Sequence, residues 1–98
     1  MAFIQIIEGH TSRGDEIEAL SAELENRTQD RFTVRRSIRT QDRDDPSRSM
    51  VIVFFDSYES AMENSNLPET DEFSRKMMEL VDGPPTFHNL EVVEDKTF

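Results

Sequence analysis

The 98-residue sequence contains no cysteine and no tryptophan. Without cysteine, the chain has no disulfide framework, no thiolate nucleophile and no zinc–thiolate site. Positive charge is also scarce, because 11 Lys and Arg stand against 21 Asp and Glu, for a formal net charge of -10. Such a field repels phosphate backbones and anionic lipid surfaces, so the composition argues against a nucleic-acid or membrane partner.

Long apolar runs and the common cofactor motifs are missing as well. The longest apolar run, residues 50–55, is far too short to cross a bilayer, which takes about 20 residues. The acidic clusters at 42–45 and 69–72 lack the glycine and distal glutamate of a calcium loop, and no two histidines stand three or four residues apart. No glycine-rich phosphate loop is present either. We therefore expect a cytoplasmic protein with no metal site and no bound cofactor.

What is present is a regular succession of apolar patterns. Runs of strand formers and alternating apolar residues predict strands, and apolar residues at helical spacing with acidic residues on the other faces predict helices. Asp15 is the predicted N-cap of the first helix. The predicted elements are a strand over 3–7, a helix over 15–28, an edge strand over 32–39, a strand over 50–55, an interrupted helix over 56–81 and a strand over 86–93.

The second helix is interrupted in the stretch AMENSNLPETDEF. Asparagine and serine at 64–66 weaken a helix, and Pro68 removes a backbone donor, while Thr70 is the predicted cap of the helix that resumes. The helix then ends at 82–85, where Gly83 suits a left-handed conformation. A broken helix in so short a chain raises the question of what the break does.

The order β-α-β-β-α-β predicts one ferredoxin-like α+β domain over residues 1–98, with two helices on one face of a four-stranded antiparallel sheet. Its first and third strands lie in the middle, and here they are the most apolar. The run at 50–55 needs cover on both faces, but the helices can cover only one. We therefore predict a homodimer, a dimeric α+β barrel, in which Val51, Val53 and Phe55 face the second copy.

Five short segments carry a resemblance to a known family: residues 3–5, 54–57, 64–69, 82–83 and 86–89. In them the sequence resembles the dimeric α/β-barrel superfamily of antibiotic-biosynthesis-monooxygenase-like proteins, and in particular small bacterial members. The resemblance implies a homodimer with a pocket between sheet and helices in each subunit. Relatives use that pocket to oxidise polycyclic or quinol-like aromatics without a bound cofactor, or to bind and degrade haem. The haem branch works with a tryptophan, which this chain lacks.

Five polar residues are candidate site residues. Asn64 and Asn66 could orient a ligand oxygen, although capping the helix end is the more economical interpretation. His88 is the candidate catalytic base, with a buried structural role as its alternative. Arg36, in phase with apolar residues of its strand, could bring a cation to the pocket or extend into water. Gln5 is an inward amide that needs a partner or a ligand.

Two functions remain open from the sequence. The first is a cofactor-independent monooxygenase, in which His88 would deprotonate a small aromatic or quinol-like substrate, and Asn64 or Asn66 would fix its oxygens. The second is a non-catalytic module that binds a small apolar ligand or another protein. The absence of tryptophan and the single tyrosine, Tyr58, favour the second.

Overall fold

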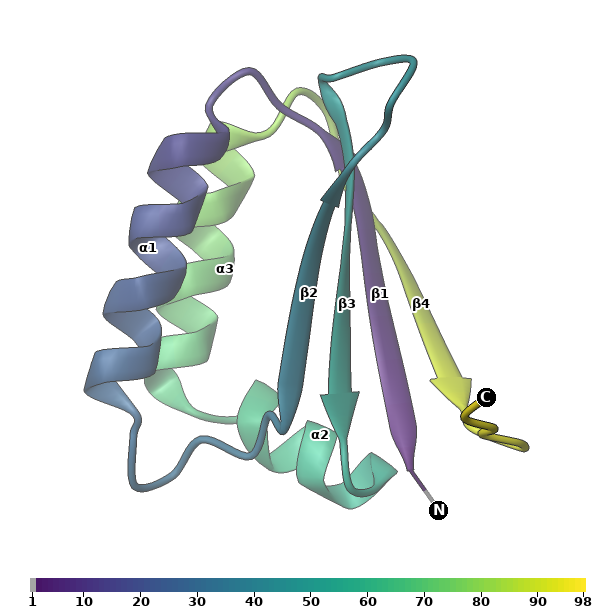
Figure 1. Ribbon diagram of the computed structural model, residues 1–98. Helices are drawn as coiled ribbons and strands as arrows, with labels where there is room; N and C mark the ends of the chain where they lie inside the picture. Colours follow the sequence, from purple (N-terminus) through teal and green to yellow (C-terminus); the bar gives the residue numbers. More distant parts are fainter. Residues whose placement is uncertain (1) are drawn as a thin grey trace.

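A computed structural model describes residues 2–98 as four strands and three helices (Figure 1). The strands form one antiparallel sheet in the order β2-β3-β1-β4, so the predicted ferredoxin-like arrangement is confirmed, with β1 and β3 in the middle. The elements are β1 Phe3–His10, α1 Gly14–Arg27, β2 Arg36–Gln41, β3 Arg48–Phe55, α2 Tyr58–Ser65, α3 Pro68–Leu80 and β4 Thr86–Glu91.

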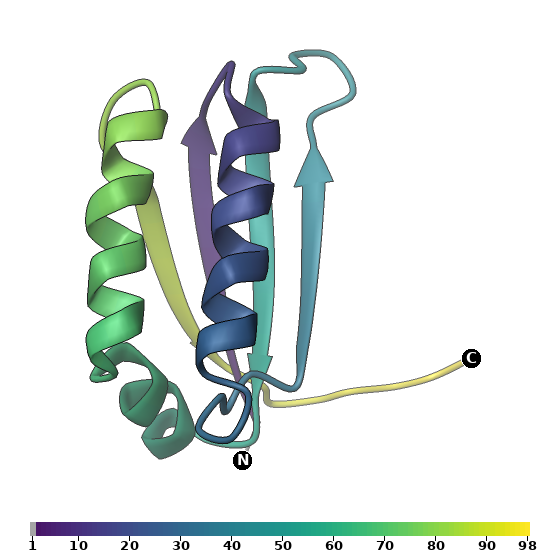
Figure 2. The ribbon, with the colours of Figure 1, turned by 90° about the vertical axis from the view of Figure 1, so that its left-hand side faces the viewer.

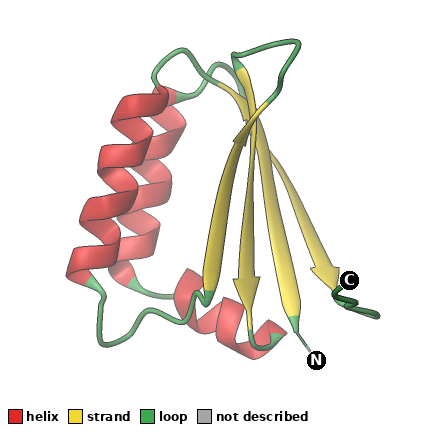
Figure 3. Ribbon diagram, in the orientation of Figure 1, coloured by secondary structure: helices red, strands yellow, loops and turns green. Residues whose placement is uncertain are grey.

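The helices and the sheet form two layers. α1 and α3 run side by side over one face of the sheet, and α2 lies across the end where β2 begins and β3 ends (Figures 1 and 2). No helix of residues 2–98 covers the opposite face (Figure 3). We call these the helix face and the open face of the sheet.

Strand register decides which residues lie on each face. Phe3 and Phe55 pair across β1 and β3 and pack with Ala61 of α2 in the buried core, and Val53 packs against the same cluster. Val51, Val53 and Phe55 therefore lie on the helix face, and the prediction that they face a second copy is wrong. The residues between them, such as Ile52, occupy the open face. Both sets are apolar, so the pattern of β3 could not distinguish the two faces.

The start of β2 also differs from the prediction. The strand begins at Arg36, whereas Val34 precedes it and packs against the core cluster on the helix face. Arg36 pairs with Phe54, and its guanidinium lies over the Phe54 ring, 5.5 Å from the centroid, on the open face. Arg36 therefore does not share a face with Val34, because the ladder starts only after the segment that enters the core.

Helix ends follow local chemistry with two corrections. The Ser57 hydroxyl caps α2 by accepting the Ser60 N–H at 3.1 Å. α1 begins at Gly14 with Arg13 at the N-cap, not Asp15. α3 begins at Pro68, whose missing N–H costs nothing in a first turn, so Thr70 is not its cap. Gly83, with φ of 92°, takes the left-handed conformation after α3.

Candidate functional site

A cavity of about 510 Å³ lies between the helix face of the sheet and the helix layer, and we call it the helix–sheet cavity. Its wall is mainly apolar. Ile7, Ile17, Leu24, Phe32, Val34, Val51, Val53, Phe55, Phe73, Met77 and Phe87 line it. Such a lining with a few polar groups is typical of small-molecule sites.

Asn64 places an unpaired amide in this wall. The residue lies in the last turn of α2 and is buried, with 9% of its surface exposed, and its Oδ1 has no hydrogen-bond partner within residues 2–98. The Thr70 hydroxyl, which also lines the cavity, is likewise buried without a partner in that part of the chain. An orphaned buried polar atom costs about 1–3 kcal/mol. These two atoms are therefore suited to a ligand that brings its own hydrogen-bonding groups.

Asn66, two residues later, has a different environment. It is the exposed C-cap residue of α2, and its backbone N–H donates to the Met62 carbonyl at 3.0 Å. It is not among the residues that line the helix–sheet cavity. The structure thus separates two asparagines that the sequence treated together, because Asn64 is buried in the last turn of α2 and Asn66 is exposed at its C-cap.

Gln5 lies on the helix face and lines the cavity. Its Nε2 donates to Asn89 Oδ1 of β4 at 3.2 Å, directly across the strand pair. The predicted need for a partner is therefore met by a second neutral amide. Of this pair, Gln5 is the residue that lines the cavity.

His88 lies on the open face, on the other side of the sheet from Asn64. Its Nε2 is 3.6 Å from Glu8 Oε2, and Glu8 accepts a hydrogen bond from Arg48, which also donates to Asp42 Oδ2 at 2.8 Å. The Arg48 hydrogen bond is the main reason why the pKa of Glu8 lies below its ordinary value. The structure therefore does not bring His88 or Arg36 together with Asn64 at the cavity.

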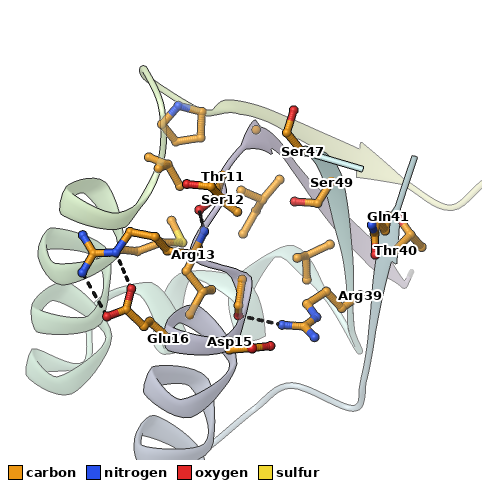
Figure 4. A pocket seen from close by; sticks show the side chains of 18 of the residues that line it. Thr11, Ser12, Arg13, Asp15, Glu16, Arg39, Thr40, Gln41, Ser47 and Ser49 are labelled. Carbon is orange, nitrogen blue, oxygen red and sulfur yellow. Dashed lines mark hydrogen bonds and ion pairs between the residues drawn. The ribbon is translucent and has the colours of Figure 1, made fainter. Parts of the chain in front are cut away.

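A second cavity of about 770 Å³ opens at the loop end of the sheet, beside the first turn of α1, and we call it the loop-end cavity (Figure 4). Polar loop residues form much of its wall. It shares Ile7, Ile17, Arg39, Val51 and Met77 with the helix–sheet cavity. The candidate site is the helix–sheet cavity, because the unpaired buried atoms lie there.

Arg39 is the lining residue that the sequence analysis missed. From β2 it donates to the Gly14 carbonyl and to Glu18 Oε2, both at 3.1 Å. The alternation of β2 pointed away from it, because Arg36 was expected on the inner face, and a residue three positions from Arg36 lies on the opposite face of a strand.

The described part of the chain holds few features of other site types. Within residues 2–98, no three His, Asp or Glu side chains stand close enough together to hold a metal ion. No helix of those residues has the length and apolar character needed to cross a membrane.

Comparison with known proteins relates the chain to others through its fold. No protein-family model matches the sequence. No curated protein matches it either. Solved structures do match over nearly the whole chain. Rv0793 from Mycobacterium tuberculosis is 13% identical with a TM-score of 0.78, covering 99% of this chain and 100% of its own.

Two further structures carry a stated activity. SnoaB, a cofactor-independent oxygenase from Streptomyces nogalater solved as an asparagine-to-alanine variant, is 9% identical with a TM-score of 0.80, over 96% of this chain and 95% of its own. An antibiotic biosynthesis monooxygenase is 14% identical with a TM-score of 0.73, over 96% of this chain and 100% of its own. The chain therefore has the fold of the antibiotic biosynthesis monooxygenases, as the resemblance in its sequence predicts.

Proposed function

We propose that the protein binds a small hydroxylated aromatic molecule in the helix–sheet cavity and oxidises it with dioxygen, without a bound cofactor. The observation that carries the proposal is the buried Asn64 Oδ1, which has no partner within residues 2–98, in a mainly apolar wall. SnoaB, a cofactor-independent oxygenase of the same fold, supports the reaction class. Fold alone is weak evidence for function, so the proposal rests mainly on the unpaired amide of Asn64.

The cavity supplies the interactions that such a substrate needs. Its apolar wall takes the ring out of water, and Asn64 Oδ1 accepts a hydrogen bond from a ring hydroxyl. The Thr70 hydroxyl can both accept and donate, so it can also hold the oxygen after that oxygen has lost its proton. In the net reaction, a ring C–H carbon ortho or para to the hydroxyl becomes a carbonyl with one atom of dioxygen, and the hydroxyl becomes the second carbonyl of a quinone. The ring hydrogen and the hydroxyl hydrogen leave with the other oxygen atom as water.

A second candidate function is binding without catalysis. The side chains that line the cavity and could accept a proton from a ligand are Glu18, Glu25 and Asp71, and all three are exposed to solvent. Water that reaches these carboxylates can return a proton to a deprotonated substrate before dioxygen attacks it, so they are poorly placed to act as the general base. This observation favours a ligand-binding module.

Oxygen uptake separates the two functions. The wild-type protein is mixed with anthrone-type and naphthol-type compounds, and binding is followed by thermal shift while dioxygen is followed with an electrode. An oxygenase should bind and consume one dioxygen per product, whereas a binding module should raise the melting temperature without consumption. Asn64→Ala should lose both signals, and Asn66→Ala, at an exposed position outside the cavity, should keep them. Equal behaviour of the two variants would contradict the proposed site.

We further propose that the protein is a cytoplasmic homodimer joined through the open faces of two sheets. Half-buried apolar side chains of β1 and β3 lie on that face, and no helix within residues 2–98 covers them. Contiguous apolar patches of this kind on soluble proteins usually mark an interface. Light scattering should give twice the chain mass of 11.4 kDa, and a monomer at micromolar concentration would contradict the dimer.

A further inference from the structure

One cation lies in the wall of a cavity that is otherwise lined by apolar, neutral polar and acidic side chains. Arg39 is the only Lys or Arg among the described residues that line the helix–sheet cavity. The chain as a whole carries a formal net charge of -10. Glu18, Glu25 and Asp71 line the same cavity, so the position open to an anion is the one beside Arg39, where the guanidinium adjoins the apolar wall and opposite charges attract most strongly.

Arg39 and Asn64 stand at opposite ends of this space. Asn64 lies in the last turn of α2, and α2 lies across the end of the sheet where β2 begins (Figure 1). Arg39 lies in the second half of β2 and reaches the first turn of α1, at the other end of the helix layer (Figure 4). Apolar residues such as Ile7, Ile17 and Val51 lie in the walls of both cavities, at the end where Arg39 stands. An elongated ligand can therefore contact both polar groups with an apolar body between them.

The guanidinium of Arg39 can donate further hydrogen bonds. Two of its hydrogen bonds go to the Gly14 carbonyl and to Glu18 Oε2, and a guanidinium has five N–H donors. Its partner Glu18 is 66% exposed and Arg39 itself 45% exposed, so water screens their ion pair. A second carboxylate can thus join Glu18 or displace it at small cost.

From these contacts we propose that the natural ligand is an elongated aromatic anion, whose carboxylate binds Arg39 and whose hydroxyl faces Asn64. This inference rests on the proposed binding of a hydroxylated aromatic in the helix–sheet cavity and specifies its chemical class. Arg39 is the residue that selects the anion, and Asn64 recognises the hydroxyl. The fork geometry of arginine suits a carboxylate better than a single point charge would.

Matched probes test the selection directly. Fluorescence titration compares 6-hydroxy-2-naphthoate with 2-naphthol, which lacks the carboxylate, and with 2-naphthoate, which lacks the hydroxyl. We expect the wild-type protein to bind 6-hydroxy-2-naphthoate at least tenfold more tightly than either relative. Arg39→Gln should remove the advantage over 2-naphthol, and Asn64→Ala should remove the advantage over 2-naphthoate.

Arg35→Gln is the control for net charge. Arg35 also pairs with a carboxylate, Asp56 at 2.8 Å, but it is not among the residues that line either cavity. This variant should bind all three probes as the wild type does. Glu18→Gln, which removes the competing carboxylate, should tighten binding of 6-hydroxy-2-naphthoate severalfold and leave 2-naphthol unchanged.

The outcomes separate this inference from the function on which it rests. If 2-naphthol binds as tightly as 6-hydroxy-2-naphthoate, and Asn64→Ala weakens both, the cavity binds hydroxylated aromatics but the anion selection is overturned. Equal losses of 6-hydroxy-2-naphthoate affinity in Arg39→Gln and Arg35→Gln would overturn it too, as an effect of overall charge. If no probe binds the wild type, both the inference and the proposed site are overturned.

Discussion

On β3, Val51, Val53 and Phe55 lie beneath the helices, while Met50, Ile52 and Phe54 lie on the face that no helix of residues 2–98 covers. The two sets have similar side chains. What distinguishes the faces is contact with the rest of the fold, because Phe55 packs with Phe3 and with Ala61 of α2. The comparison shows that an apolar residue in a strand indicates a need for cover without saying what provides it.

The polar groups of the two faces differ more than the apolar ones. On the helix face, neutral amides occur at Gln5, Asn89 and the nearby Asn64, and the ion pair of Arg39 with Glu18 is open to water. On the open face, Glu8 and Arg48 form an ion pair. An ionised group out of contact with water costs far more than a neutral one, and ions are tolerated where they pair and reach water. The buried polar group at the helix–sheet cavity, Asn64, is accordingly neutral, and the charged groups of both faces are paired and reach water.

The largest effect is expected from a charge placed under the helices. Val53→Asp sets a carboxylate against the core cluster and should lower the free energy of unfolding by about 3 kcal/mol or more, because nothing there pairs with it. Urea unfolding followed by circular dichroism measures the loss, with Val53→Ala as the control for side-chain size. If Val53→Asp loses no more stability than Val53→Ala, Val53 does not lie on the helix face.

The same charge one residue earlier should act on association instead. Ile52→Asp lies on the open face opposite Ile6 and Ile38, so the folded monomer can keep the carboxylate in water. We expect the dimer to weaken at least 100-fold, which is about 2.8 kcal/mol, with little loss in the monomer. Light scattering over a concentration series measures this. A dimer of unchanged affinity would mean that the open face is not the interface.

A smaller effect of opposite sign is expected at the cavity. Asn64→Leu replaces an unpaired buried amide by an apolar side chain of similar size and should raise the free energy of unfolding by about 1 kcal/mol while abolishing ligand binding. Asn66→Leu, at an exposed cap, should do neither. Thermal unfolding of both variants tests this. A destabilised Asn64→Leu would show that the amide has a structural partner.

The smallest effect concerns the ion pairs of the open face. The Arg48 hydrogen bond holds the pKa of Glu8 below its ordinary value of 4.5, so the folded state favours the ionised form of Glu8 more than the unfolded state does. The stability that the ionised Glu8 adds is therefore present above pH 4.5. It is lost as the pH falls through the lower pKa that Glu8 has in the folded protein. The melting temperature of Glu8→Gln should fall less between pH 6 and pH 3 than that of the wild type. Parallel curves would contradict this, and Glu59→Gln, at an exposed position, is the control.

The residues of the site were only partly predictable, because the sequence pattern did not show which face of each strand meets the helices. Asn64 and Gln5 were expected near a pocket, and both line the helix–sheet cavity. His88 was expected beside them but lies across the sheet, and Arg39 was not expected at all. A one-residue error in phase moves a side chain to the other face of a strand. The irregular entry into β2 at Val34 introduced such an error for Arg36 and Arg39.

The sequence by itself determined the order of the elements, the two central strands, the break at Pro68 and the turn at Gly83, because periodicity, proline and glycine act locally on the backbone. Only the tertiary structure decided which face of β3 meets the helices, which of two neighbouring asparagines is buried, and which arginine of β2 lines a cavity. Those outcomes depend on contacts between residues far apart in the chain, since apolar side chains on both faces of a strand satisfy the same local pattern.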